Sequence, residues 1–162
     1  VVRISGIVVR KAELEDSDLV LAWRNDAEAI RQSVSGLAVE AAVHQQWFEG
    51  ALESTTTVLL IAETELKTGI TPIGMCRFDL LKAGVFAVSI NMGPNFRGRG
   101  SGGTVLQSGI AFLKGEVSAP VVIEAVVHES NSPSLRVFEK TGFSVFGQEA
   151  PWLHLRLAPQ GG

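Results

Sequence analysis

Hydrophobic and polar residues alternate along several short stretches of the chain, and a period of two is typical of β-strands. The clearest example covers residues 85–90 and ends before Pro94, which cannot donate a hydrogen bond to a neighbouring strand. Residues 121–127 are almost continuously apolar, which predicts a strand buried on both faces. Further strands are expected at 4–9, 56–63, 73–80, 143–148 and 152–158, with a turn at 68–72.

Apolar residues spaced three and four positions apart predict helices between these strands. Leu106, Ile110 and Leu113 share one face of a helix over residues 104–114. Four other helices are expected: one after the acidic residues 15–18, a short one capped by Asp26, one over 39–52, and one between Ser132 and Gly142. The helix over 39–52 carries Val43, Trp47 and Ala51 in one row, with His44, Phe48 and Leu52 beside it. Together these elements predict an α+β fold, a mixed and mainly antiparallel sheet flanked by helices on both faces, in a single domain over residues 1–162.

The composition of the chain argues against several kinds of binding partner. The 162 residues carry a formal net charge of −3, and the pI of about 5.6 gives no support to nucleic-acid binding. Cys76 is the only cysteine, which excludes an intramolecular disulfide and a cysteine-based zinc site, and no metal is expected. No apolar run approaches the ~20 residues that span a bilayer. We therefore expect a cytoplasmic protein without a membrane partner.

A glycine-rich segment connects the strand at 85–90 to the helix at 104–114. The first amides of a helix have no internal partner and lie at the positive end of the helix dipole, so they favour an anion. Glycines without side chains let a phosphate approach the backbone, and the arginines Arg97 and Arg99 add charged donors. A plain glycine-rich turn is the alternative. The glycines concerned are Gly98, Gly100, Gly102 and Gly103.

Two well-known phosphate motifs fit this segment poorly. A P-loop requires a lysine after its last glycine, and none is present here. Gly98, Gly100 and Gly103 match the glycine spacing of a dinucleotide-binding fingerprint. That fingerprint belongs to the first turn of a Rossmann unit, and too little chain follows this segment to form one.

The pattern Arg97-x-x-Gly100-x-Gly102 instead resembles the acyl-CoA pyrophosphate loop of the GNAT superfamily of N-acetyltransferases. Residues 125–143 are similar to the next motif of that family, in which a strand is followed by an asparagine, here Asn131, and a helix closes with Gly142-Phe143. The two motifs occur in the family's order and spacing, and the resemblance covers essentially the whole chain. It implies an enzyme that moves an acetyl group from acetyl-CoA to an amine.

The resemblance also implies which residues bind the cofactor. Backbone groups of Ile90, Asn91 and Met92 would pair with the pantetheine arm, and an N–H near Met92 would face the thioester oxygen. Asn131 and Ser134 would support that arm, although Asn131 could simply cap a helix. Phe138 and Lys140 would lie near the nucleotide, although Phe138 could equally be core. The pyrophosphate would be held by Arg97, Gly98, Arg99, Gly100, Ser101, Gly102 and Gly103.

One departure concerns the proton for the departing thiolate. The family often has a tyrosine at the position of Phe138, whereas this chain contains no tyrosine. A free thiol has a pKa of about 8.5, so water could suffice. The candidates for the general base are His44, His128 and Glu124, each of which could instead be an ordinary surface or hydrogen-bonded group. Met92, His44 and His128 are the predicted catalytic residues.

The N-terminal half is similar to a subset of the family that includes ribosomal-protein N-terminal, spermidine-type and pseudaminic-acid-pathway acetyltransferases. The shared elements are Trp23-Arg24-Asn25-Asp26, Arg31 and His44-x-x-Trp47-Phe48. They imply a small-molecule amine acceptor such as a UDP-amino sugar, with a protein N-terminus or a polyamine as alternatives, bound by Arg31, His44 and Trp47. A non-catalytic acyl-CoA-binding module stays possible because the tyrosine is missing. We expect a monomer or a homodimer.

Overall fold

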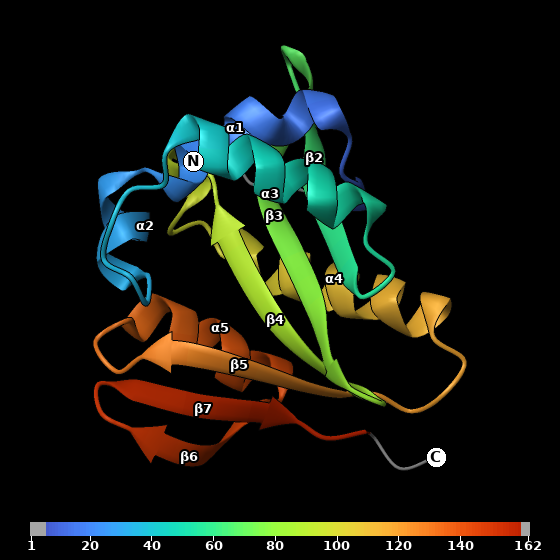
Figure 1. Cartoon of the computed structure of the whole chain (residues 1–162), viewed down its shortest axis with the longest axis vertical. Coiled ribbons are helices and arrows are strands. Elements are labelled where there is room, and N and C mark those ends of the chain that lie inside the picture. Colours follow the sequence, from blue (N-terminus) through green and yellow to red (C-terminus); the bar gives the residue numbers. More distant parts are fainter. Residues whose placement is uncertain (1–5, 160–162) are drawn as a thin grey trace.

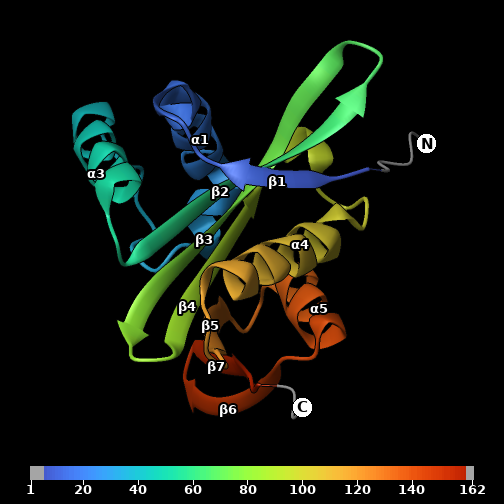
Figure 2. The same cartoon turned by 90° about the vertical axis from the view of Figure 1, so that its right-hand side faces the viewer.

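The computed structural model describes residues 6–159, which form a seven-stranded sheet with helices on both faces (Figures 1 and 2). The strand order is β1-β2-β3-β4-β5-β7-β6, and only β4 and β5 pair in parallel among the described strands. The predicted α+β class is therefore confirmed. The strands are β1 (Val8–Lys11), β2 (Thr57–Leu66), β3 (Gly69–Lys82), β4 (Val85–Met92), β5 (Val122–His128), β6 (Ser144–Glu149) and β7 (Trp152–Leu157).

Five α-helices and two short 3-10 helices connect the described strands. Figure 2 shows α1 and α3 on one side of the sheet, called the front here, and α4 and α5 on the other, called the back. The helices are α1 (Ser17–Arg24), α2 (Ala27–Gln32), α3 (Ala41–Glu53), α4 (Ser101–Glu116) and α5 (Ser132–Thr141), and the 3-10 helices are η1 (Leu14–Asp16) and η2 (Pro94–Phe96). No helix among residues 6–159 is both long and apolar enough to cross a membrane.

Strand β3 begins earlier than the sequence predicts. The expected turn at 68–72 is shorter, because β2 and β3 are joined through Lys67 and Thr68 and pairing resumes at Gly69. Pro72 lies inside β3 beside a shift in register, and such an irregularity tolerates the missing N–H of a proline. The predicted strand at 4–9 is found as Val8–Lys11, and Ile4 lies outside the described residues.

Helix α3 turns only part of its two predicted rows to the sheet. His44, Phe48 and Ala51 are buried, whereas Val43 and Trp47 are exposed. Phe48 and Ala51 join Val20 and Trp23 of α1 in the front core, over Leu59 and Ile61 of β2 and Met75 of β3. The larger core lies behind the sheet, between β2–β5, α4 and α5.

The prediction that residues 121–127 are buried on both faces is wrong. Val126 of β5 is 51% exposed, while its neighbours Ala125 and Val127 are buried. Figure 1 shows why: α1, α2 and α3 lie over the upper part of the sheet and leave the front of β5, β7 and β6 uncovered. Antiparallel sheets commonly have one face in solvent in this way.

Candidate active site

Strands β4 and β5 separate in the middle of the sheet. They pair only from Val85 to Ala87 on β4 and from Val122 to Glu124 on β5. Beyond these residues β4 continues to Met92 along β3, and β5 continues to His128 along β7 (Figure 1). The facing edges of β4 and β5 therefore carry backbone groups that the sheet does not pair.

Alternation along β4 identifies these backbone groups. Gly93 N–H donates to the carbonyl of Ile73 at 2.8 Å, so Gly93 faces β3. In an antiparallel pair every second residue faces the same neighbour. Asn91 and Ser89 therefore face β3 as well, whereas Ile90 and Met92 direct their N–H and C=O groups toward the open edge. The predicted cofactor contact through the Asn91 backbone is wrong for this reason, and the contacts through Ile90 and Met92 stay predictions.

The glycine-rich loop leads from this edge into α4. Gly98 and Gly100 adopt left-handed conformations with φ of 70° and 76°, which favour glycine. Gly100 is the N-cap of α4 and has no side chain to bond the first helical amides. A Cβ added at Gly98, Gly100 or Gly103 would meet no atom within 4 Å, so the backbone here is open to a ligand. These features fit a bound phosphate.

The side chain of Met92 packs tightly between β3 and α4. A Cβ at Gly74 would lie 2.7 Å from Met92 Sδ, and a Cβ at Gly102 would lie 4.0 Å from Met92 Cγ. The following residue, Gly93, is as closely approached from the front, since a Cβ there would lie 2.9 Å from Trp23 Nε1. The end of β4 is therefore closely packed, and this packing requires the missing side chains of Gly74 and Gly93.

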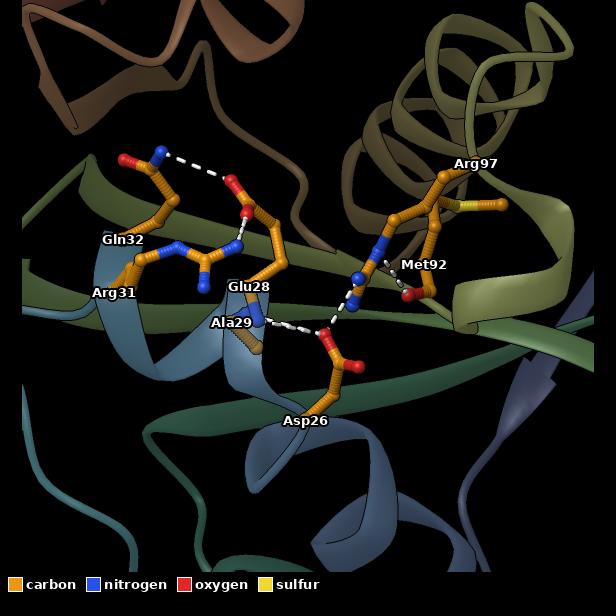
Figure 3. A network of polar contacts seen from close by, with 7 residues as sticks. All are labelled: Asp26, Glu28, Ala29, Arg31, Gln32, Met92 and Arg97. Atoms are coloured by element: carbon orange, nitrogen blue, oxygen red, sulfur yellow. Dashed lines mark hydrogen bonds and ion pairs between the residues drawn. The ribbon is translucent and has the colours of Figure 1, made fainter.

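Arg97 lies at the start of the loop, but its guanidinium is occupied within the protein (Figure 3). Nη1 donates to Asp26 Oδ2 at 2.6 Å, and Nε donates to the Met92 carbonyl at 3.2 Å. The prediction that this side chain adds its charge to the pyrophosphate site is therefore not supported. Arg99 is exposed, and it is the arginine of the loop that is placed to meet a ligand.

The residues predicted after β5 divide between structural and exposed positions. Asn131 Oδ1 accepts a hydrogen bond from Ser134 N–H at 3.2 Å, so both residues form the N-terminal cap of α5. Phe138 is 3% exposed and packs edge-on against Phe143 in the core. This burial contradicts a nucleotide contact for Phe138 and favours the packing role. Lys140 is exposed near the end of α5.

A match to a family model identifies the protein family that has this split sheet and loop. The model described as an acetyltransferase (GNAT) domain matches residues 7–144. The chain belongs to the GNAT acetyltransferase family. It is accordingly an acetyl-CoA-dependent N-acetyltransferase, and the open β4 edge and the loop at the start of α4 are features that fit this cofactor. No curated protein matches the chain.

Solved structures with the same GNAT fold are distant in sequence. A domain from Methanocaldococcus jannaschii superposes with a TM-score of 0.83 at 18% identity, covering 95% of this chain and 99% of the other. The spermidine N-acetyltransferase of Vibrio cholerae, solved with CoA and spermine, gives 0.80 at 13% identity over 94% and 95% of the two chains. The aminoglycoside acetyltransferase AAC(6')-Ib, solved with coenzyme A, gives 0.76 at 18% over 94% and 95%.

His44 is placed away from the open edge of this acetyltransferase. It is 4% exposed, and its Nε2 lies 3.0 Å from the Ser17 carbonyl, which links α3 to α1. Burial lowers the pKa of His44, although the Ser17 hydrogen bond opposes that shift. With Nε2 donating to a carbonyl in the helix layer, the geometry favours a packing role for His44 and gives no support to the predicted roles as a base or a substrate contact.

The two other candidate bases lie along β5. His128 ends the strand, and its Nδ1 accepts from Ser130 N–H at 3.1 Å and lies 2.7 Å from Ser130 Oγ. An accepting Nδ1 places the ring proton of neutral His128 on Nε2. Glu124 Oε1 accepts from Arg156 Nη2 at 2.7 Å and from Arg156 Nε at 3.2 Å, so its carboxylate is paired.

The predicted acceptor residues lie on α2 and α3. Arg31 pairs with Glu28 on the exposed side of α2 (Figure 3). Trp47 is 38% exposed, and the guanidinium of Arg77 lies 5.2 Å from its ring centroid, a cation–π distance.

Cys76 is buried beneath α4, and burial raises the pKa of its thiol to about 12, which makes it an apolar filler and not a nucleophile.

Asp26 is the site residue whose partner the sequence does not reveal. The sequence indicates a helix cap, and its Oδ2 does accept from the N–H groups of Glu28 and Ala29. Its bond to Arg97 joins residues 71 positions apart, so no local pattern predicts it. Ser101, Gly102 and Gly103 lie in the first turn of α4, where Ser101 is buried, and their contacts with the cofactor stay predictions. No group of three potential metal ligands occurs within residues 6–159.

Proposed function

We propose that this enzyme acetylates the primary amine of a small molecule, with acetyl-CoA lying along the open edge of β4. The observation that supports this proposal is that Ile90 and Met92 direct N–H groups that β3 does not pair toward the open edge, beside a loop whose glycines leave the start of α4 uncovered. Such an edge suits the amides of pantetheine, and the loop suits the pyrophosphate. The N–H of Met92 would polarise the thioester carbonyl.

Roles for the chain's own residues follow from this placement. Fixed positions for donor and acceptor supply much of the rate enhancement. The neutral amine nitrogen would form the amide bond as the carbon–sulfur bond breaks. The proton that this nitrogen then loses would pass to Ser130 Oγ, which gives its own proton to Nδ1 of His128, 2.7 Å away. Because the chain has no tyrosine and Phe138 is buried, the departing thiolate would take its proton from water.

For the acceptor we favour an amino-sugar nucleotide, with a protein N-terminal amine or a polyamine as the alternative. Half-exposed Trp47 offers a ring to stack on a base. Arg31 would offer a cation to a diphosphate after leaving Glu28, its partner in an exposed ion pair that costs little to break. The similar fold of an aminoglycoside acetyltransferase adds support for an amino sugar, and that of a spermidine acetyltransferase supports a polyamine. A cytoplasmic enzyme, monomeric or homodimeric and without nucleic-acid or membrane partners, suits such substrates.

A second candidate function is acyl-CoA binding without turnover. Phe138 supports it, because the hydroxyl that often protonates the thiolate in this family is absent from the chain. This candidate predicts CoA binding but no transfer to any amine.

Release of the CoA thiol with a panel of acceptors tests both candidates. The panel should hold UDP-amino sugars, spermidine, aminoglycosides and N-terminal peptides. We expect thiol release that depends on acetyl-CoA and on a UDP-amino sugar. Selective release with a peptide or a polyamine would replace the acceptor while keeping the reaction. Binding of acetyl-CoA without release by any amine would favour the non-catalytic module.

A further inference from the structure

The structure assigns to Asp26 a role in acetyl transfer: we propose that it is a positioning residue, which acts through Arg97 to hold the Met92 peptide in the orientation that the thioester requires. This role rests on the proposed function. Asp26 itself touches neither cofactor nor acceptor in this account. Its contribution is to fix one side chain that bridges three parts of the site.

The Asp26 carboxylate receives three hydrogen bonds through one oxygen. Asp26 Oδ2 accepts from Arg97 Nη1 at 2.6 Å, from Glu28 N–H at 3.1 Å and from Ala29 N–H at 3.3 Å (Figure 3). The hydrogen bond from Arg97, followed by these backbone bonds, keeps the pKa of Asp26 below its usual value. An ionised oxygen at the start of α2 therefore anchors Arg97 at all ordinary pH values.

Arg97 also binds the backbone at the end of β4. With Nη1 held by Asp26, Arg97 directs Nε to the Met92 carbonyl at 3.2 Å. That carbonyl belongs to the open edge of β4, since Gly93 is already bonded to Ile73 on the β3 side. Arg97 thereby restrains the peptide between Met92 and Gly93, and through the backbone dihedrals of Met92 it limits the direction of the adjacent N–H.

Asp26 also connects this part of the site to helix α2. Asp26 is the N-cap of α2, the helix that carries Arg31. The same ion pair therefore joins α2 to the end of β4, two elements that are far apart in the sequence. A change at Asp26 should alter the alignment of acetyl group and amine, and alignment affects turnover more than it affects cofactor binding.

The variant Asp26→Asn separates this role from folding. Asparagine is as good an N-cap as aspartate, so α2 should be kept while the charge-assisted bond to Arg97 is lost. We expect kcat to fall by about 10- to 100-fold, because loss of a complete oxyanion-hole donor costs ~100-fold or more. Asp26→Glu, which keeps the carboxylate, should recover part of this loss. Glu116→Gln, which breaks the exposed ion pair with Lys11, is the matched control and should behave as wild type.

Calorimetric binding supplies a readout that does not depend on turnover. If Asp26 aligns the Met92 N–H with the thioester, Asp26→Asn should keep its Kd for CoA and lose affinity for acetyl-CoA by about 2- to 10-fold, the value of one hydrogen bond. Unchanged kcat together with an unchanged ratio of the two Kd values would overturn the positioning role alone. Failure of the wild type to bind either form would overturn the proposed function, and the positioning role with it. An equal loss of affinity for CoA and acetyl-CoA would assign Asp26 to cofactor binding and also refute the proposal.

Discussion

Arg97 and Arg99 lie two residues apart in the same loop, but only Arg97 forms an ion pair within the part of the chain that the structure describes. Arg97 is committed to Asp26 and the Met92 carbonyl, whereas Arg99 is exposed. A free guanidinium can form bidentate bonds to a phosphate, and a guanidinium in an ion pair must first break that pair. We therefore place the pyrophosphate cation at Arg99 and the structural cation at Arg97.

Replacing Arg99 with alanine should weaken the binding of CoA. We expect the Kd to rise by about 10-fold through loss of a charge-assisted hydrogen bond, and the difference should shrink in high salt because the site is exposed. Titration calorimetry at two salt concentrations measures this. Lys67→Ala removes an exposed cation from a different connection, the β2–β3 turn, and serves as control. Equal affinity of Arg99→Ala and wild type would show that the loop backbone alone binds the phosphates.

The burial of His44 predicts how the free energy of unfolding depends on pH. Burial lowers its pKa from 6.5 in the folded state, so the unfolded chain binds a proton more readily. Stability from this group is present above about pH 6.5 and is lost as the pH falls through that value toward the folded pKa. Urea unfolding between about pH 7 and pH 5 should therefore show a smaller decline for His44→Gln, which can still donate to Ser17. Identical declines would contradict the assigned role.

At the scale of elements, local patterns predict much of the structure. The spacing of Leu106, Ile110 and Leu113 correctly indicates α4, and alternation indicates β4. The row that α3 buries could not be read in the same way. Val43 and Trp47 are as apolar as the residues beside them, and only the position of α3 over Leu59 and Ile61 decides which row faces inward.

The contact of α4 with β3 predicts opposite effects for two glycines in one helix. A Cβ at Gly109 would lie 2.8 Å from Cys76 Sγ, whereas a Cβ at Gly115 would meet nothing within 4 Å. Gly109→Ala should destabilise the protein by about 1–3 kcal/mol through overpacking. Gly115→Ala should stabilise it by about 0.5–1 kcal/mol through helix propensity. Chemical denaturation measures both, and equal effects would show that α4 is not pressed against β3.

At the scale of the whole molecule, the site depends on contacts between distant segments. The fold class, the order of the elements and the glycine loop follow from the sequence because their signals are local. The partner of Arg97 is 71 residues away, and the uncovered front of β5 depends on how far α1–α3 extend over the sheet. Neither has a local signature, which is why the sequence does not reveal the ion pair of Arg97 and wrongly predicts that Val126 is buried.

The central claim is that acetyl-CoA completes the open edge of β4, and amide hydrogen exchange measured by NMR tests it residue by residue. In the free protein we expect fast exchange at Ile90 and Met92, and slow exchange at Ser89 and Asn91, which face β3. With acetyl-CoA at ~100 times its Kd, exchange at Ile90 and Met92 should slow by about 100-fold. Fast exchange at both residues under saturating acetyl-CoA would contradict the account.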